Sequence, residues 1–74
     1  MIPRYLDLAT YLSNDWSLAA EVCEDMDINR NYLRRLIRNA RADNIGVDFE
    51  DGKIRLSIRT SPSQIDLMIS SLPE

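Results

Sequence analysis

The chain has 74 residues, of which 45% are hydrophobic and 28% charged, with a net charge of -3; this composition is typical of one small folded domain and not of an unfolded segment. A single cysteine and the absence of histidine exclude an internal disulfide, a Cys–His nucleophile pair and a structural zinc site. No apolar stretch reaches the length of a membrane helix and the first residues lack the apolar core of a secretory signal, so we expect a cytoplasmic protein, either nucleoid-associated or in a host cytoplasm.

Apolar residues at helical spacing predict three helices in the first 43 residues. The first is expected over residues 3–12, because proline suits the first turn of a helix. The second begins near Ser17 as its N-cap and ends at Asp27, since aspartate tolerates the left-handed conformation of a helix end. Asn29 caps the third helix, which continues to about residue 43. Its inner stripe consists of Leu33, Leu36, Ile37 and Ala40.

Residues 45–59 alternate between apolar and polar side chains, which predicts two strands. Asp51-Gly52 predicts the tight turn of a hairpin between them. Closing the hairpin at this turn places three apolar pairs on one face: Ile45 with Ile58, Val47 with Leu56, and Phe49 with Ile54. The other face then pairs opposite charges, Asp48 with Arg55 and Glu50 with Lys53, which favours this register.

A fourth, short helix is predicted over residues 62–72, with Ser61 as its N-cap and Pro62 at its first position. Its apolar residues recur at helical spacing and therefore share one face. They are Ile65, Met68, Ile69 and Leu72. This face either folds back onto the first helix or contacts the same helix of a second subunit.

Charged residues are segregated along the chain. Residues 1–27 contain one basic and six acidic residues, whereas residues 28–59 contain eight basic and four acidic residues, so these segments carry net charges of -5 and +4. No acidic residue lies between Asp27 and Asp43. Two electrically different surfaces are expected, with the basic one centred on the third helix.

The order helix, helix, tight turn, helix, hairpin, helix resembles the winged helix-turn-helix family, a mostly helical α+β fold. The resemblance covers about residues 5–58 and is greatest for the N-terminal DNA-binding domain of biotin repressors. It rests on Leu12-Ser13-Asn14, Trp16, Val22, Met26, Ile28-Asn29-Arg30, Leu33 and Ile37. Together with the predicted final helix, it indicates one domain over residues 1–74, with a helix-turn-helix over 17–43, a two-stranded wing over 45–59 and a C-terminal helix over 62–72.

Two features depart from the family pattern. Asp27 stands where the family usually has glycine at the corner between the second and third helices. The second helix also carries Glu21, Glu24, Asp25 and Asp27. In the family this helix crosses near a phosphate strand, which these acids would repel. Pairing with Arg4 or with arginines of the third helix would remove the repulsion, at the cost of neutralising part of the basic surface.

The resemblance implies that the third helix enters the major groove and that the hairpin contacts the backbone or minor groove. Arginine forms paired hydrogen bonds with guanine, and asparagine with adenine, so the residue types of the third helix fit base recognition. The expected DNA-binding residues are Asn29, Arg30, Asn31, Tyr32, Arg34, Arg35, Arg38, Arg41, Lys53 and Arg55. No glycine-rich phosphate loop or other catalytic motif occurs, so no enzyme activity, cofactor, metal, small-molecule ligand or membrane contact is expected.

We therefore predict a sequence-specific protein that binds double-stranded DNA, a small transcriptional regulator or repressor of bacterial, phage or plasmid type. One subunit with about five to eight cationic contacts binds DNA weakly at physiological salt, which favours a homodimer through the face formed by Ile65, Met68, Ile69 and Leu72. Two alternatives stay open. The chain is a winged-helix module that binds a protein through its acidic first third, or it is one domain of a larger regulator.

Overall fold

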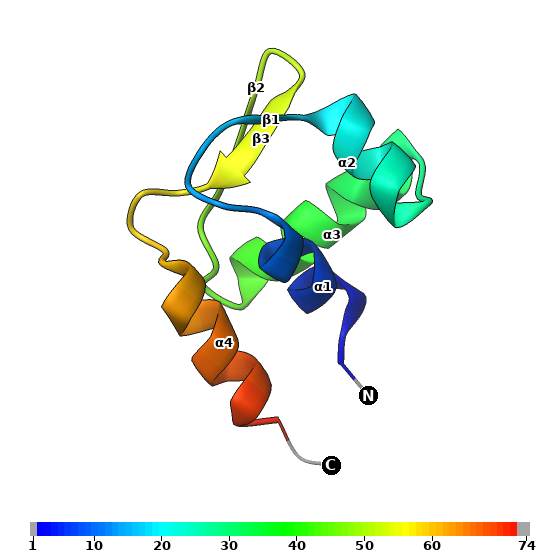
Figure 1. Cartoon of the computed structure of the whole chain (residues 1–74). Helices are drawn as coiled ribbons and strands as arrows, with labels where there is room; N and C mark the ends of the chain where they lie inside the picture. The colour runs from blue at the N-terminus through cyan, green and yellow to red at the C-terminus, as the bar shows by residue number, and fades with distance from the viewer. Residues whose placement is uncertain (1, 73–74) are drawn as a thin grey trace.

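The structure is a computed structural model that describes residues 2–72, which form four helices and a three-stranded antiparallel sheet (Figure 1). Along the chain these elements are α1 (Arg4–Tyr11), β1 (Ser17–Leu18), α2 (Ala19–Met26), α3 (Arg30–Ala42), β2 (Val47–Glu50), β3 (Lys53–Leu56) and α4 (Pro62–Ser70). The strand order is β1-β3-β2. The predicted α+β class, the helices and the hairpin are confirmed. No helix within residues 2–72 combines the length and the apolar character needed to cross a bilayer.

The core lies where α1 crosses α3 and where the inner face of the sheet meets the helices (Figure 1). Leu6 and Leu8 of α1 pack there with Leu33 of α3, and all three are at most 1% exposed. The strand β3 adds Ile54 and Leu56, both fully buried. Each such side chain contributes about 1.5–3 kcal/mol by leaving water, so this apolar contact fixes how α3 lies against the sheet.

The corner between α2 and α3 has the predicted caps. Asp27 adopts a left-handed conformation with φ of 56° and ends α2. The N–H of Ile28 then donates to the carbonyl of Cys23 at 2.9 Å. Asn29 caps α3, because its side-chain oxygen accepts the backbone N–H of Tyr32 at 2.8 Å. This corner sets the direction in which α3 leaves α2.

The predicted N-cap of α2 is wrong by one residue. Ser17 belongs to β1, and the N-cap of α2 is Leu18, whose side chain makes no capping hydrogen bond. The N–H of Ala19 donates instead to the carbonyl of Gly52 at 2.8 Å. The free edge of β3 thus takes the place of a side-chain cap, and it draws Ser17 and Leu18 into an antiparallel pair with Ile54 and Lys53.

The hairpin has the predicted register for Val47 with Leu56 and Phe49 with Ile54. The predicted pairing of Ile45 with Ile58 is wrong, because β3 ends at Leu56 and residues 57–60 form a turn. Gly46 approaches this turn so closely that an added Cβ would lie 2.7 Å from the Cβ of Ser57. Its N–H donates to the hydroxyl of Thr60 at 2.9 Å. Ile58 is left 87% exposed.

The final helix packs inward. Ser61 and Gln64 form a reciprocal capping box with Pro62 at the first turn, as the sequence predicts for the cap. Ile65 is 1% exposed and packs in the core, so it offers no surface to a second subunit. Met68, Ile69 and Leu72 are half-buried against the same core. The apolar face of α4 therefore folds back within the chain, next to α1.

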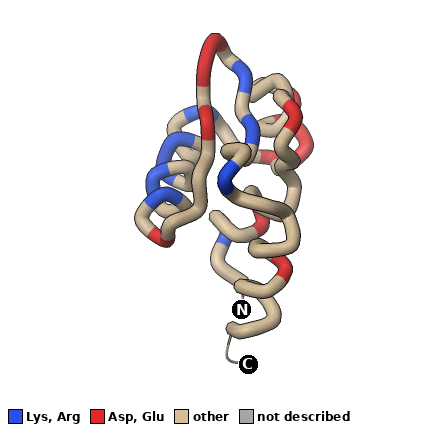
Figure 2. The backbone as a smooth tube through the Cα atoms, turned by 90° about the vertical axis from the view of Figure 1, so that its left-hand side faces the viewer, with Lys and Arg blue, Asp and Glu red and all other residues tan. Residues whose placement is uncertain are grey.

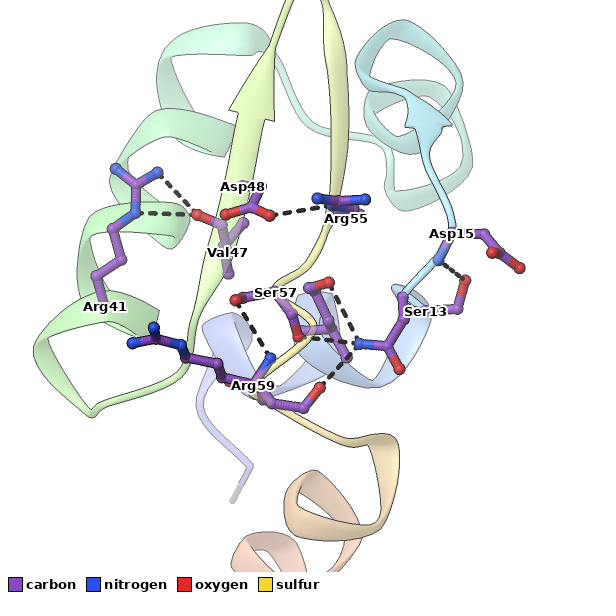
Figure 3. Close-up of polar contacts among 11 residues, drawn as sticks. Ser13, Asp15, Arg41, Val47, Asp48, Arg55, Ser57 and Arg59 are labelled. Atoms are coloured by element: carbon purple, nitrogen blue, oxygen red, sulfur yellow. Dashed lines mark hydrogen bonds and ion pairs between the residues drawn. The ribbon is translucent and has the colours of Figure 1, made fainter.

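Asn14 connects the segment before β1 to the end of the hairpin. Its side-chain amide donates to the carbonyls of Leu56, Ser57 and Thr60 at 3.3, 3.0 and 2.9 Å; the three hydrogen bonds are drawn beside Ser13 and Ser57 in Figure 3. The carbonyls of Leu56 and Thr60 are in part-buried positions. One side chain thus fixes both the β3 end and the turn that leads to α4.

Replacing Asn14 with alanine is expected to lower the free energy of unfolding by about 1–3 kcal/mol, because part-buried carbonyls lose their donor. Urea unfolding followed by circular dichroism measures the change. Asn39→Ala is the matched control, since Asn39 is exposed on α3 and a surface substitution changes stability by about 0.5 kcal/mol or less. Equal unfolding midpoints for the two variants would contradict the role given to Asn14.

Candidate nucleic-acid interface

The helix α3 has one buried face and one cationic face. Leu33, Leu36, Ile37 and Ala40 are at most 5% exposed, which directs the remaining positions outward. Five arginines are exposed: Arg30, Arg34, Arg35, Arg38 and Arg41. We call these five residues the arginine face. In Figure 2 the basic positions of α3 follow one another along one side of the molecule, apart from the acidic positions of α2.

Within residues 2–72 no carboxylate forms an ion pair with the arginine face. In the part of the chain that the structure describes, the ion pairs are Arg4 with Asp7 at 3.5 Å and Arg55 with Asp48 at 3.0 Å. The expected pairing of the α2 acids with Arg4 or with α3 is therefore wrong. Arg4 donates instead to the carbonyl of Met26 at 2.7 Å. The five guanidinium groups keep their charge available to a ligand.

Two stripes run along the arginine face. Arg34, Arg38 and Arg41 line a cleft of about 390 Å³ between α3 and β2, together with Ile37 and Phe49. Their spacing of four and three residues places them one above the other on the helix. The second stripe, which includes Asn31 and Arg35, lines a smaller hollow beside Asn29 and Tyr32. Seven of the predicted DNA-binding residues thus line these two hollows on α3 and its N-cap.

Arg41 is held in place by the hairpin. Its Nε and Nη2 donate to the carbonyl of Val47 at 3.2 and 2.8 Å (Figure 3). Near the same end of α3, the hydroxyl of Tyr5 donates to the carboxylate of Asp43 at 2.9 Å. This hydrogen bond raises the pKa of Tyr5 above its ordinary value. The C-terminal end of the arginine face is thereby positioned by both β2 and α1.

The basic side chains of the hairpin, Lys53 and Arg55, do not lie on the same surface as the arginine face. Ile54 and Leu56 of β3 are buried, so Lys53 and Arg55 lie on the opposite face of the sheet. Arg55 pairs with Asp48, and its guanidinium lies 4.3 Å from the ring centre of Trp16. The predicted register of Asp48 with Arg55 and Glu50 with Lys53 is confirmed. Lys53 and Arg55 thus lie on a different surface from the arginine face, and their contact with DNA stays a prediction.

The acids of α2 form a separate surface. Glu21, Glu24, Asp25 and Asp27 are all exposed. Asp25 accepts a hydrogen bond from the hydroxyl of Tyr11, which raises the pKa of this tyrosine. Tyr11 and Leu18 are 45% and 49% exposed beside this helix. We call Tyr11, Leu18, Glu21, Glu24 and Asp25 the acidic face.

Sequence reasoning missed two residues near the arginine face. Alternation assigned Phe49 to the core, but it is half-buried and lines the cleft. Arg59 was placed on a strand, whereas it lies in the exposed turn after β3, and its side chain extends toward the α3 side of the hairpin in Figure 3. Ser57 is the sequence signal that could have placed Arg59 in a turn. Its hydroxyl accepts the N–H of Arg59 at 3.4 Å, and serine makes such local hydrogen bonds in turns.

Comparison of the chain with protein-family models, with curated proteins and with solved structures found no match. The site is therefore interpreted from its own geometry. Among the described residues no three acidic or cysteine side chains are placed to hold a metal ion. What the site offers is a row of exposed guanidinium groups on a helix of 13 residues.

Proposed function

We propose that the chain is a winged helix-turn-helix protein that binds double-stranded DNA at specific sites through α3, as a small transcriptional regulator of bacterial, phage or plasmid type. The observation that carries the proposal is the arginine face, with five exposed arginines on 13 residues of helix and no ion pair to any of them within residues 2–72. Four helices with a three-stranded sheet are compatible with this family.

The proposed contact places α3 in the major groove. A helix of 13 residues is about 20 Å long, and the major groove of B-DNA is wide enough for one helix. Asn31, Arg34 and Arg35 lie in the N-terminal half of α3, the part that reaches base edges in helix-turn-helix proteins. Arg38 and Arg41 follow toward its C-terminal end, where they suit phosphates. Asn29 and Tyr32 hold the corner through their capping bond.

Repulsion limits how the hairpin approaches DNA. Its tip carries Glu50 and Asp51, both exposed, and these carboxylates repel phosphates. Arg55 is committed to Asp48 and Trp16, and Lys53 lies on the same outer face of the sheet. The proposal therefore assigns the binding energy to α3, with little contribution from the hairpin tip.

A salt titration of duplex binding tests the proposal. Each neutralised phosphate releases about 0.9 counterion, so the five arginines predict a slope of log affinity against log salt of about -3 to -5. A duplex selected from a random pool, followed by fluorescence polarisation, provides the measurement. Arg34→Ala with Arg35→Ala is expected to abolish sequence preference, since one bidentate base contact contributes about 1–3 kcal/mol of discrimination.

Lys53→Ala is the matched control, because it removes a cation from the outer face of the sheet. It is expected to change duplex affinity by less than threefold. Circular dichroism verifies that each variant is folded. Absence of duplex binding at low salt, or a loss caused by Lys53→Ala as large as that caused by the double arginine variant, would overturn the proposal.

A dimer remains part of this proposal. Two half-sites raise the affinity of small helix-turn-helix proteins. With Ile65 buried in the core, the remaining apolar surface of α4 consists of the half-buried Met68, Ile69 and Leu72 and of Leu67, which is 67% exposed. Light scattering in the presence of the selected duplex reports the number of subunits.

The acidic face favours a second candidate function, the binding of a basic protein. Exposed tyrosine and leucine next to carboxylates combine apolar contact with charge complementarity. If this candidate is correct, Glu24→Gln with Asp25→Asn abolishes capture of the partner, while Arg34→Ala with Arg35→Ala leaves capture intact. Capture of the partner is measured by pull-down from cells of the source organism, with the unaltered chain and each double variant as bait. The opposite pattern would contradict the candidate.

A further inference from the structure

The cleft between α3 and β2 combines cations with an aromatic floor. Its walls carry the guanidinium groups of Arg34, Arg38 and Arg41, and its apolar part consists of Ile37 and Phe49. Its volume of about 390 Å³ lies within the usual range of small-molecule sites, about 300–1,000 Å³. No acidic side chain of the described residues lines it. The chemistry favours a ligand with an anionic group and a planar ring.

Arg41 gives the cleft a fixed donor. A guanidinium has five N–H groups, and Arg41 directs its Nε and Nη2 toward the carbonyl of Val47, so the remaining N–H groups are oriented before a ligand arrives. Arg38 lies three residues earlier on the same wall. Guanidinium groups match the geometry of phosphate oxygens, so this end of the cleft suits a phosphate.

Phe49 gives the cleft a stacking surface. Its backbone is held in the hairpin opposite Ile54, and its side chain is half-buried, which fixes the ring while leaving part of it accessible. A base that stacks on an aromatic ring gains about 1–3 kcal/mol. Bases inside a duplex are already stacked on each other, so only an unpaired base has a face to offer to this ring.

We propose that the cleft binds one unpaired nucleotide unit, with its phosphate on Arg38 and Arg41 and its base against Phe49. Two sources supply this chemistry, a free mononucleotide and an unpaired nucleotide of a single strand. The site is distinct from duplex recognition by Asn31 and Arg35, although its three arginines, Arg34, Arg38 and Arg41, belong to the arginine face as well. A nucleotide in the cleft would compete with the phosphates of a duplex.

Isothermal titration at low salt with adenosine monophosphate, ribose 5-phosphate and adenosine tests the proposal on the full chain. Adenosine monophosphate is expected to bind about tenfold more tightly than either fragment, because it alone carries both groups. Phe49→Leu keeps an apolar side chain. It is expected to reduce the affinity for adenosine monophosphate to the affinity measured for ribose 5-phosphate. Arg38→Gln is expected to weaken the binding of adenosine monophosphate and of ribose 5-phosphate, because both carry a phosphate. Lys53→Gln, a control on the outer face of the sheet, is expected to change neither affinity.

A short oligodeoxyadenylate distinguishes the two sources. Binding of the strand with the same dependence on Phe49, but without binding of the mononucleotide, assigns the site to single strands. If adenosine monophosphate and ribose 5-phosphate both bind the unaltered protein, equal affinity for the two would overturn the proposal even if Phe49→Leu failed to fold. So would a folded Phe49→Leu variant with unchanged affinity for both the mononucleotide and the strand.

A parallel duplex titration separates this proposal from the proposed function. Asn31→Ala with Arg35→Ala is expected to weaken duplex binding and to leave the nucleotide affinity within twofold. Nucleotide binding that depends on Phe49, without duplex binding, would uphold the cleft and reject the duplex. Duplex binding without any binding of the mononucleotide or the single strand would uphold duplex recognition and reject the cleft.

Discussion

The burial of one face of α3 is the constraint on which the rest of the structure depends. Leu33, Leu36, Ile37 and Ala40 can all enter the core only if the helix presents its other positions to water. Five arginines on one short helix repel one another, by a few tenths of a kcal/mol per neighbouring pair. Burial of Leu33 alone contributes about 1.5–3 kcal/mol. The apolar stripe therefore determines the orientation of the helix, and the arginine face follows from it.

The hairpin divides the remaining charges between two surfaces. Because strand residues alternate between faces, the register that buries Ile54 and Leu56 turns Lys53 and Arg55 outward. The Asp48 carboxylate and the Trp16 ring then hold Arg55 there. The inner side of β2 faces α3 and contributes Phe49 to the cleft. The same register therefore places Arg55 on the outer face of the sheet and Phe49 on its inner face.

Local sequence signals predicted the parts of the fold that are held by neighbouring residues. The left-handed Asp27, the Asn29 cap, the Asp51-Gly52 turn and the Ser61 cap all act within a few residues. The errors arose where a distant segment decides the outcome. The two residues of β1 form a strand only because the edge of β3 is free, and no periodicity reveals a strand so short. The end of β3 at Leu56 depends on the contacts of Gly46 with Ser57 and Thr60 of the following turn.

Local signals also predicted one part of the candidate site, whereas the parts that depend on distant segments were not predicted. The positions of the α3 arginines follow from helical periodicity, which is local. The absence of ion pairs to them within the described residues, the Arg41 contact with Val47 and the cleft at Phe49 are tertiary features. For Lys53 and Arg55 the register was predicted correctly, but neither the register nor the charge indicates which face of the sheet meets a ligand.

The most direct test is to observe the guanidinium groups themselves. Nuclear magnetic resonance resolves the Nε–Hε signal of each arginine during titration with a duplex selected from a random pool. We expect the signals of Arg34, Arg35 and Arg38 to shift or broaden, while the signal of Arg55 and the backbone amides of Glu24 and Asp25 stay unchanged. Shifts confined to α2 and the outer face of the sheet, with the signals of α3 unmoved, would contradict this expectation.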